Sequence, residues 1–332
     1  MSGSTIRTGT TGAASLADGP LAPLPLGAEE EHRHDAGETV PPQPAQRGPA
    51  TDCTADSAGG LTFDLRLAGT DAGTESEDAG LLLRRRPDAS GETEEVRLPL
   101  TPVQDGEPGT LRAALPSTVR LTEGRWNVFL VLAGRDPRRL SPGVNDLRSL
   151  VDRVPHENRG WLGVRIPYAT KHGNLSVRAW MRWPHAEAGA LRMRDGALEV
   201  GGRLYGGEVS ATARLEAWPR RGPAEPVVAD AAGTGGDRRE FAAALPFAAL
   251  AGGRLWDLWL RPAEGAEAVR VARILDDVPD KKRIFTYPAQ PVARDAGESA
   301  AAGPVATETA AVTAKPYYTL NNDLAVRIDR AE

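Results

Sequence analysis

Three blocks of this sequence occur twice in the same order, and this repeat constrains the fold more than any other feature. Residues 115–126 begin with Leu-Pro and end in Trp, and residues 245–256 do the same. The matching blocks are 61–69 with 198–206, 115–130 with 245–260, and 167–178 with 316–327. Because ordered repetition of this kind is typical of repeated structural units, we predict two diverged copies of one module.

Within each copy, short runs alternate apolar and polar residues, which is the pattern of a β-strand with one buried face. Asp, Gly and Pro interrupt these runs at short intervals, as they do in the turns between strands. One short helical turn is expected within 144–154. The predicted strands of the first copy are 61–67, 81–84, 96–100, 111–115 and 126–132.

This pattern favours an all-β fold with two tandem immunoglobulin-like β-sandwich modules after a disordered N-terminal tail. We expect the acidic tail at residues 1–57, which contain no aromatic residue and offer little apolar surface for burial. Module one then spans 58–183 and module two spans 184–332. A mobile loop is expected at about 293–313, because that segment consists mainly of Ala, Gly, Glu and Thr.

The distribution of charge argues against a nucleic-acid partner. The 332-residue chain has a formal net charge of −5, and the excess of acid lies within residues 1–57. The remaining residues are close to neutral, whereas a nucleic-acid interface needs a basic face or stripe. We therefore expect no nucleic-acid binding.

The cysteine content and the hydropathy of the chain limit the cofactors that it could hold and the compartment in which we expect it. Cys53 is the only cysteine and lies in the predicted tail, so no intramolecular disulfide and no thiolate metal cluster can form. No segment has the ~20 apolar residues of a membrane span, and the N-terminus lacks the apolar core of a signal peptide. We expect a cytoplasmic protein without a cofactor.

The tryptophans of the repeated blocks have two interpretations. Trp126 and Trp256 lie in strongly apolar predicted strands and are expected to anchor a core, as large aromatic residues usually do. The alternative is an exposed platform on which a sugar ring stacks. The segment 180–185, Trp-Met-Arg-Trp-Pro-His, joins the two copies and is interpreted as an apolar seam between them.

The Pro-Tyr-x-Thr blocks at 167–170 and 316–319 each lead into a turn and a final strand. Residues 171–174 and 320–323 contain Asn or Gly, which tolerate positive φ, so we predict hairpin turns there. The Tyr hydroxyl is expected to close a structural hydrogen bond, with ligand binding as the alternative. The candidate binding residues are Tyr168, Thr170, Asn174, Tyr317, Tyr318 and Thr319.

A search for catalytic motifs gives no nucleophile elbow, phosphate-binding loop or dinucleotide-binding fingerprint. We therefore assign no catalytic residue and no metal ligand. The histidines His156, His172 and His185 are not spaced as a metal pair and are interpreted as surface or turn residues. The adjacent acids Asp276 and Asp277 are the nearest match to the cation-binding pair of nucleotide-sugar transferases. Such a transferase also needs an α/β domain, and no βαβ alternation is found.

The blocks at 125–129 (Arg-Trp-Asn-Val-Phe) and 167–178 (Pro-Tyr-x-Thr-x-x-x-Asn-Leu-Ser-Val-Arg) resemble accessory β-sandwich repeats of some actinobacterial glycosyltransferases. Those enzymes resemble the ones that build teichoic-acid-type or other cell-wall glycopolymers, and their repeats follow a separate catalytic domain. The resemblance covers nearly all of 58–332. The second copy departs from the pattern, with Asn-Asp-Leu-Ala at 322–325. Since no catalytic domain is recognisable, the resemblance implies an accessory role.

Three functional hypotheses follow from these observations. The first is a non-catalytic accessory protein of cell-wall glycopolymer synthesis that binds glycan, such as a cell-wall polysaccharide, or assembles with a glycosyltransferase partner. The second is a genuine transferase with an unrecognised site near Asp276 and Asp277. The third is a structural module whose edge strands pair between chains to form a homo-oligomer.

Overall fold

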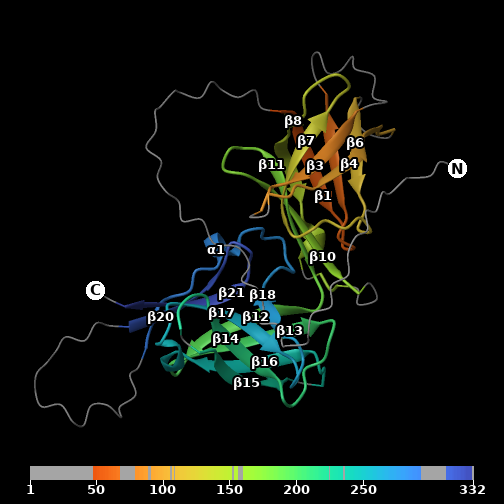
Figure 1. Cartoon of the computed structure of the whole chain (residues 1–332). Coiled ribbons are helices and arrows are strands. Elements are labelled where there is room, and N and C mark those ends of the chain that lie inside the picture. Colours follow the sequence, from red (N-terminus) through yellow and green to blue (C-terminus); the bar gives the residue numbers. More distant parts are fainter. Residues whose placement is uncertain are drawn as a thin grey trace, which may run out of the picture. The chain divides into compact units, whose positions relative to one another are not determined.

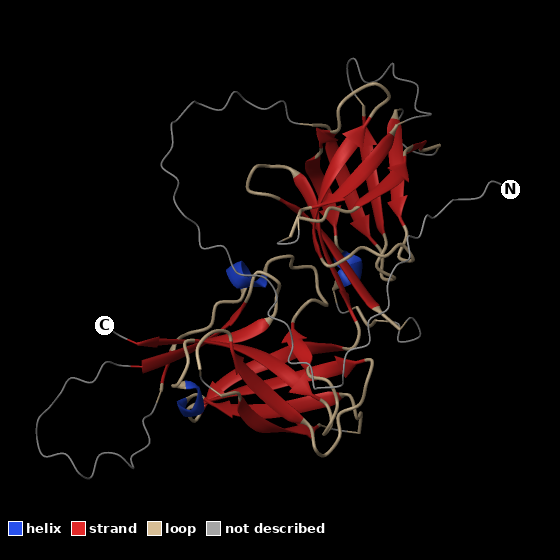
Figure 2. Cartoon of the chain, viewed as in Figure 1, coloured by secondary structure: helices blue, strands red, loops and turns tan. Residues whose placement is uncertain are grey.

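The computed structural model describes residues 48–67, 79–88, 91–104, 107, 109–151, 153–155, 160–223, 225–234, 236–292 and 312–330. The chain divides into two compact units, and all described residues belong to the second unit, Gly37–Glu332. These residues form strands with only short helical segments, which confirms the predicted all-β fold (Figures 1 and 2). The predicted tail up to residue 47 and the loop at 293–311 lie outside the described residues.

The first module contains two sheets. One sheet has the strand order β5-β6-β2-β1-β9, and the other has the order β10-β11-β7-β3-β4, with β8 paired to β7. Five of its strands coincide with the strands predicted for the first copy. The strands are β1 (Ala50–Ala55), β2 (Leu61–Arg66), β3 (Gly80–Arg85), β4 (Glu95–Pro99), β5 (Thr101–Pro102), β6 (Thr110–Leu115), β7 (Gly124–Val131), β8 (Arg138–Arg139), β9 (Ser141–Asp146), β10 (Leu162–Ala169) and β11 (Leu175–Arg182).

Alternate residues of these strands form one core between the two sheets. Phe63 of β2 and Leu81 and Trp126 of the other sheet are buried in a single cluster. Trp126 has no exposed surface, and its indole Nε1 donates a hydrogen bond to the carbonyl of Thr122 over 3.0 Å. Large apolar side chains from both sheets therefore share one core.

The second module closes its strands into a ring. The order is β14-β15-β16-β13-β12-β18-β17, and the pairing of β14 with β17 completes it, while β21, β20 and β19 extend from β17. Its core contains Phe241, Trp256 and Ile328. The strands are β12 (His185–Arg194), β13 (Ala197–Tyr205), β14 (Arg214–Pro219), β15 (Val227–Gly233), β16 (Glu240–Pro246), β17 (Leu255–Arg261), β18 (Val269–Ala272), β19 (Gln290–Pro291), β20 (Val312–Tyr318) and β21 (Leu324–Arg330).

Most strand pairs of the first module have a counterpart in the second. In both modules the first strand pairs with a later strand in parallel, as β1 with β9 and β12 with β18. The last two strands form a hairpin whose final strand pairs with the tryptophan strand: β10-β11 with β7, and β20-β21 with β17. The correspondence allows residues of the two modules to be compared position by position.

The modules differ at the edges of their sheets. In the first module the edge segments are interrupted at Leu100 and Leu140, so that β4 and β5 belong to different sheets, as do β8 and β9. In the second module β15 runs without interruption and pairs with both β14 and β16. The prediction of two immunoglobulin-like sandwiches is therefore not met in the second module, because continuous edge strands join its sheets into a ring.

The predicted end of the tail at residue 57 is too late. Ala50–Ala55 forms β1, which pairs with β2 and β9. Thr51, Cys53 and Ala55 alternate into the core, and Cys53 is 1% exposed. The sequence pattern did not indicate this strand because Thr, Cys and Ala are small and only weakly apolar, whereas neighbouring strands satisfy its backbone in the folded chain.

The described helical segments are short. A 3₁₀ turn at Arg148–Leu150 confirms the helical turn expected within 144–154, and a second lies at Ala248–Leu250. The α-helix α1 spans Lys281–Ile284. None of the helices in the described part of the chain combines the length and apolar character that a membrane crossing requires. The strand β20 begins at Val312, close to the predicted end of the loop at about residue 313.

Candidate functional site

The turn at Thr170–Asn174 connects β10 to β11. The amide of Thr170 donates to the carbonyl of Asn174 over 2.9 Å, and the amide of Gly173 donates to the carbonyl of Thr170 over 2.9 Å. The Thr170 hydroxyl accepts from the amide of Asn174 at 3.2 Å. Gly173 has φ of 72°, a conformation that Gly adopts without strain. The predicted hairpin turn is confirmed, and Thr170 and Asn174 stabilise it.

The turn at Thr319–Asp323 repeats this geometry between β20 and β21. The amide of Thr319 donates to the carbonyl of Asp323 over 2.8 Å, and the amide of Asn322 donates to the carbonyl of Thr319 over 3.0 Å. The Thr319 hydroxyl accepts from the amides of Asn321 and Asp323, both at 3.2 Å. Asn322 takes φ of 61°, as its short polar side chain permits. The second predicted hairpin turn is therefore confirmed.

The three candidate tyrosines do not occupy one site. Tyr168 on β10 and Tyr317 on β20 are half-buried and point away from the cores. Tyr318 points the other way, is fully buried, and packs with Phe285 and Tyr287 at ring-centroid distances of 5.8 and 6.4 Å. Burial raises the pKa of the Tyr318 hydroxyl. Tyr318 therefore belongs to the core, whereas Tyr168 and Tyr317 lie on sheet surfaces.

Tyr168 and Tyr317 occupy equivalent rows of their sheets. Directly paired residues of neighbouring strands point to the same face. In the first module Tyr168 pairs with Ser176, which pairs with Asn127 of β7. In the second module Tyr317 pairs with Ala325, which pairs with Asp257 of β17.

Beside each row lies an aromatic ring, two residues further along the strand that contains the buried tryptophan. An arginine of the neighbouring strand pairs with this aromatic residue. Phe129 pairs with Arg139, whose guanidinium carbon lies 5.1 Å from the ring centroid. Trp259 pairs with Arg270, also at 5.1 Å. We call these surfaces the first outer face (Asn127, Phe129, Arg139, Tyr168, Ser176) and the second outer face (Asp257, Trp259, Arg270, Tyr317, Ala325).

Carboxylates form ion pairs with Arg270 of the second outer face and with the nearby Arg220 and Arg261. Asp257 accepts hydrogen bonds of 2.6 Å from Arg220 and 2.6 Å from Arg270. Although burial alone would raise the pKa of Asp257, the hydrogen bonds from both guanidinium groups hold it below the usual value. Nearby, Glu216 accepts from the indole of Trp218 at 2.9 Å and forms an ion pair with Arg261.

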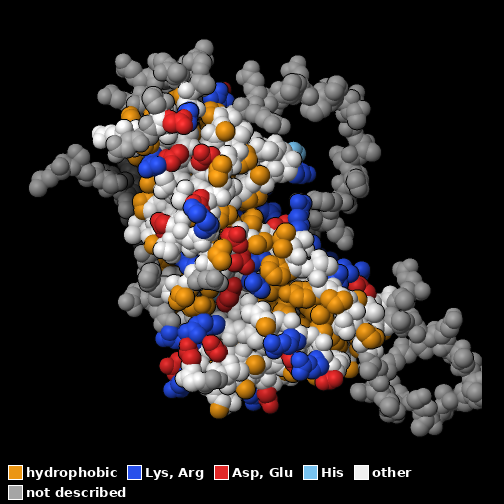
Figure 3. All heavy atoms as spheres, turned by 180° about the vertical axis from the view of Figure 1, so that it is seen from behind, with side chains coloured by type: hydrophobic (Ala, Val, Ile, Leu, Met, Phe, Trp, Pro, Cys, Tyr) orange, Lys and Arg blue, Asp and Glu red, His pale blue; other side chains and the backbone are white. Residues whose placement is uncertain are grey.

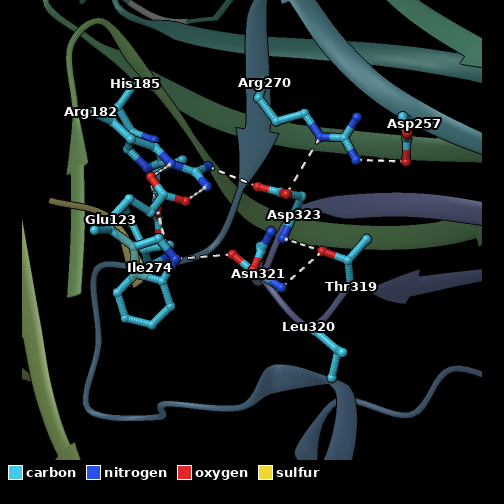
Figure 4. Close-up of polar contacts among 12 residues, drawn as sticks. Glu123, Arg182, His185, Asp257, Arg270, Ile274, Thr319, Leu320, Asn321 and Asp323 are labelled. Atoms are coloured by element: carbon cyan, nitrogen blue, oxygen red, sulfur yellow. Dashed lines mark hydrogen bonds and ion pairs between the residues drawn. The ribbon is translucent and has the colours of Figure 1, made fainter. Parts of the chain in front are cut away.

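The second outer face continues into a charged junction between the modules (Figure 4). Arg182, at the end of β11, binds Glu123 through two hydrogen bonds of 2.6 and 3.0 Å and donates to Asp323 over 2.8 Å. Asp323 also lies 3.9 Å from Arg270. Although burial opposes its charge, Asp323 and Glu123 raise the pKa of Arg182. The chain of alternating charges therefore links the last strands of both modules.

The turn before β21 completes this junction. Arg178 donates to the carbonyl of Leu320 and to the side-chain oxygen of Asn321, at 3.1 and 2.6 Å. The indole of Trp180 donates to the carbonyl of Asn321 over 3.0 Å. The segment 180–185 makes apolar contacts, as predicted, because Trp180 and Trp183 pack in one cluster with Ala272 and Ile274 of the second module. The hydrogen bonds of Arg178 and of the Trp180 indole add polar contacts that the sequence did not indicate.

Asp276, the first residue of the acidic pair that was considered as a cation site, forms structural contacts within the chain. Its carboxylate accepts from the Lys281 ammonium group and from the amide of Val278 at 2.9 Å. Arg273 lies 3.3 Å from the same carboxylate. Lys281 is fully buried, and burial lowers its pKa despite the nearby Asp276. Asp276 therefore anchors the segment around α1.

The histidines differ from one another. His172 is exposed in the β10-β11 turn, as predicted, and His156 lies outside the described residues. His185 is fully buried, and its Nε2 lies 2.6 Å from Glu187. The Glu187 carboxylate also accepts from the amide of Leu275 at 3.0 Å. The surface interpretation of His185 is wrong, because Glu187 supplies the hydrogen-bond partner that burial requires.

Trp126 and Trp256 are core residues, as expected, at 0% and 1% exposure. Among the described residues, no group of three or more His, Cys, Asp or Glu side chains could hold a metal ion. Sequence reasoning identified Tyr168 and Tyr317 but missed Phe129, Trp259, Arg139 and Arg270. The alternation of side chains along β7 and β17 could have identified the two aromatic residues. Phe129 and Trp259 each lie three residues after a buried tryptophan, so their side chains point to the opposite face of the sheet.

The comparisons with known proteins give limited similarity. No family model and no curated protein matches the chain. Two solved structures of S. aureus TarS, one of them the fragment 217–571, match with a TM-score of 0.27 and 15% identity over 59% of this chain. The chain covers 55% of the fragment and 35% of the other chain, so it spans about half or less of their length. Similarity at this level supports no transfer of individual residues.

Proposed function

We propose that this chain is a non-catalytic glycan-binding protein built from two β-modules, acting as an accessory to cell-wall glycopolymer glycosylation. The observation that carries the proposal is the presence of equivalent outer faces in both modules. Each face combines a half-buried aromatic ring, an arginine and a tyrosine on neighbouring strands.

The side chains of the outer faces suit sugar recognition. A sugar ring offers an apolar face and a rim of hydroxyl groups. Phe129 and Trp259 supply flat apolar surface, while arginine, tyrosine and amide groups supply hydrogen-bond donors and acceptors. Binding sites for small polar ligands commonly combine aromatic contact with a few placed polar groups. Repetition of the face allows two points of contact with one polymer chain, which increases avidity.

The accessory role rests on the sequence resemblance to repeats of teichoic-acid-type glycosyltransferases. We place the boundary between the modules at Trp183 and Pro184, between β11 and β12, and regard the modules as diverged copies. A glycosyltransferase partner remains part of the proposal. A site at Asp276 is not, because Lys281 and Arg273 already neutralise that carboxylate.

Binding of the full chain to an array of cell-wall polysaccharides tests the proposal. Phe129→Ala and Trp259→Ala each remove one aromatic ring, and we expect each to weaken glycan binding at least about tenfold. Ile284→Ala is the control, since Ile284 is 65% exposed on α1 and lies outside both faces. Unchanged binding in the double variant Phe129→Ala, Trp259→Ala would contradict the proposal, as would the absence of any glycan ligand.

A further inference from the structure

We infer that the first outer face and the adjacent Arg86, which hydrogen-bonds Asn127, form an anion site in which Arg86 and Arg139 bind a phosphate or carboxylate group carried by the glycan. The inference rests on the proposed function and deepens it by assigning the chemical class of the ligand. It follows from a position-by-position comparison of the two outer faces.

In the second module, the anion between the two arginines is a side chain of the protein itself. The Asp257 carboxylate lies between Arg220 and Arg270, with a hydrogen bond of 2.6 Å from each. Charge-assisted bonds of this kind are short and strong, and arginine matches the planar geometry of a carboxylate. The Asp257 carboxylate therefore balances one of the two guanidinium charges, and Asp323, 3.9 Å from Arg270, supplies a second carboxylate.

The first module has the two arginines in equivalent places. Arg139 pairs with Phe129 as Arg270 pairs with Trp259. The amide of Arg86 donates to the carbonyl of Arg125 over 2.8 Å, and the amide of Arg220 donates to Leu255 in the same way over 2.9 Å. Asn127 is the counterpart of Asp257, since each lies two residues before the aromatic ring on its strand.

Neutral groups replace the carboxylate in the first module. Arg86 donates to the side-chain oxygen of Asn127 over 3.0 Å. Arg139 donates to the Ser176 hydroxyl over 3.1 Å and to the carbonyl of Leu175 over 2.9 Å. Asn127 and Ser176 accept hydrogen bonds from the guanidinium groups but leave their two positive charges uncompensated.

No carboxylate within the described part of the chain forms an ion pair with Arg86 or Arg139. Burial and the positive charge of Arg86 lower the pKa of Arg139. Nearby, burial and Arg125 lower the pKa of Arg178 to about 10. Adjacent guanidinium groups without a counter-ion attract an anion, because its binding relieves their mutual repulsion.

The geometry leaves this arginine pair reachable from solvent. Arg86, Arg139, Asn127 and Tyr168 are half-buried, while Ser176 is buried beneath them. A bound phosphate would lie beside the Asn127 carboxamide and contact the Arg86 and Arg139 guanidinium groups from the solvent side, and Phe129 would contact the attached sugar. The first face therefore selects anionic glycans, whereas the second face offers no equivalent charge.

An NMR titration of the full chain with glucose 1-phosphate, glucose and inorganic phosphate tests the inference. We expect glucose 1-phosphate to bind the first face at least about tenfold more tightly than glucose. Asn127→Asp supplies the missing carboxylate, and Arg139→Gln removes one guanidinium charge. Each should weaken binding of glucose 1-phosphate at least about tenfold. Ala114→Asp is the matched control, because it adds the same charge at an exposed position of β6 in the other sheet.

Several outcomes separate the two proposals. Equal affinity for glucose and glucose 1-phosphate, or full binding by Asn127→Asp, would overturn the anion site. Binding of inorganic phosphate that Asn127→Asp abolishes, with no sugar dependence, would support the anion site and contradict glycan binding. Asn127→Asp should also raise the unfolding temperature, since it pairs with Arg86 and Arg139, and this readout is independent of any ligand.

Discussion

Arg182 donates a hydrogen bond to Asp323 over 2.8 Å and thereby joins the strand that ends the first module to the turn that precedes the last strand of the second. The side chains are 13% and 8% exposed. Charges this far from solvent are stable only when they are paired. The pair therefore makes the junction sensitive to the loss of either partner.

Asp323→Asn tests the energetic weight of this contact. We expect the free energy of unfolding to fall by about 2 kcal/mol, since Arg182 would keep only Glu123 as a counter-charge in a poorly solvated place. Urea unfolding of the full chain measures the change. Asp329→Asn is the control on the following strand, β21, where the partner Arg327 is 48% exposed, and should cost less than about 1 kcal/mol. Equal effects of the two variants would exclude a special role for the junction.

The lowered pKa of Asp257 predicts how the free energy of unfolding depends on pH. Its pKa is lower in the folded chain than in the unfolded chain, so the ionised form stabilises the fold. This contribution is fully present above the unfolded pKa of about 3.9 and is lost as the pH falls through the lower folded value. The stability difference between the wild-type chain and Asp257→Asn should therefore be constant between about pH 5 and 7 and shrink below about pH 4. A difference that grows on acidification would contradict this assignment.

Cys53 should be unreactive in the native protein. Its side chain is 1% exposed in β1, and burial, with a smaller effect of Asp64, raises the pKa of the thiol. Since the thiolate is the reactive form, a thiol-specific disulfide reagent at pH 8 should modify Cys53 only after unfolding in urea. Rapid modification without denaturant would mean that β1 is not stably paired.

Substitutions of Gly173 test how strongly the positive φ at this position restricts the residues that the β10-β11 turn accepts. A Cβ at this position would meet no atom within 4 Å, so the cost of substitution comes from the φ of 72° alone. Gly173→Asn copies the second module and should lower the free energy of unfolding by less than about 1 kcal/mol. Gly173→Val should cost about 1–2 kcal/mol, because a β-branched residue rarely adopts positive φ. Thermal unfolding of both variants provides the comparison, and equal stability would contradict the argument.

The strand pattern of this chain could be predicted from local alternation. The runs around Phe63, Leu81 and Trp126 each have one apolar face, and such a face must be buried in any soluble arrangement. The hairpin turns at Gly173 and Asn322 were also predictable, because positive φ restricts the residue types that fit. The strand at Cys53 was not, since small side chains give no clear periodicity.

The partners of charged side chains were beyond sequence reasoning. Asp276 and Asp277 stand out in the sequence, yet Lys281 and Arg273 convert Asp276 into a structural anchor. His185 was predicted to lie on the surface, but it is buried. Glu187, on the same strand, supplies the hydrogen-bond partner that makes its burial favourable. Electrostatic partners are set by distances across the fold, which local patterns do not contain.

The sequence by itself determined that this chain forms short, one-sided strands in two similar series, because side-chain alternation and turn chemistry act over a few residues. Only the tertiary structure decided that the second series closes into a ring, that Tyr318 is buried while Tyr317 is not, and that Asp257 fills a place left to Asn127 in the first module. The physical reason is that strand register and cross-strand pairing bring together residues far apart in the chain.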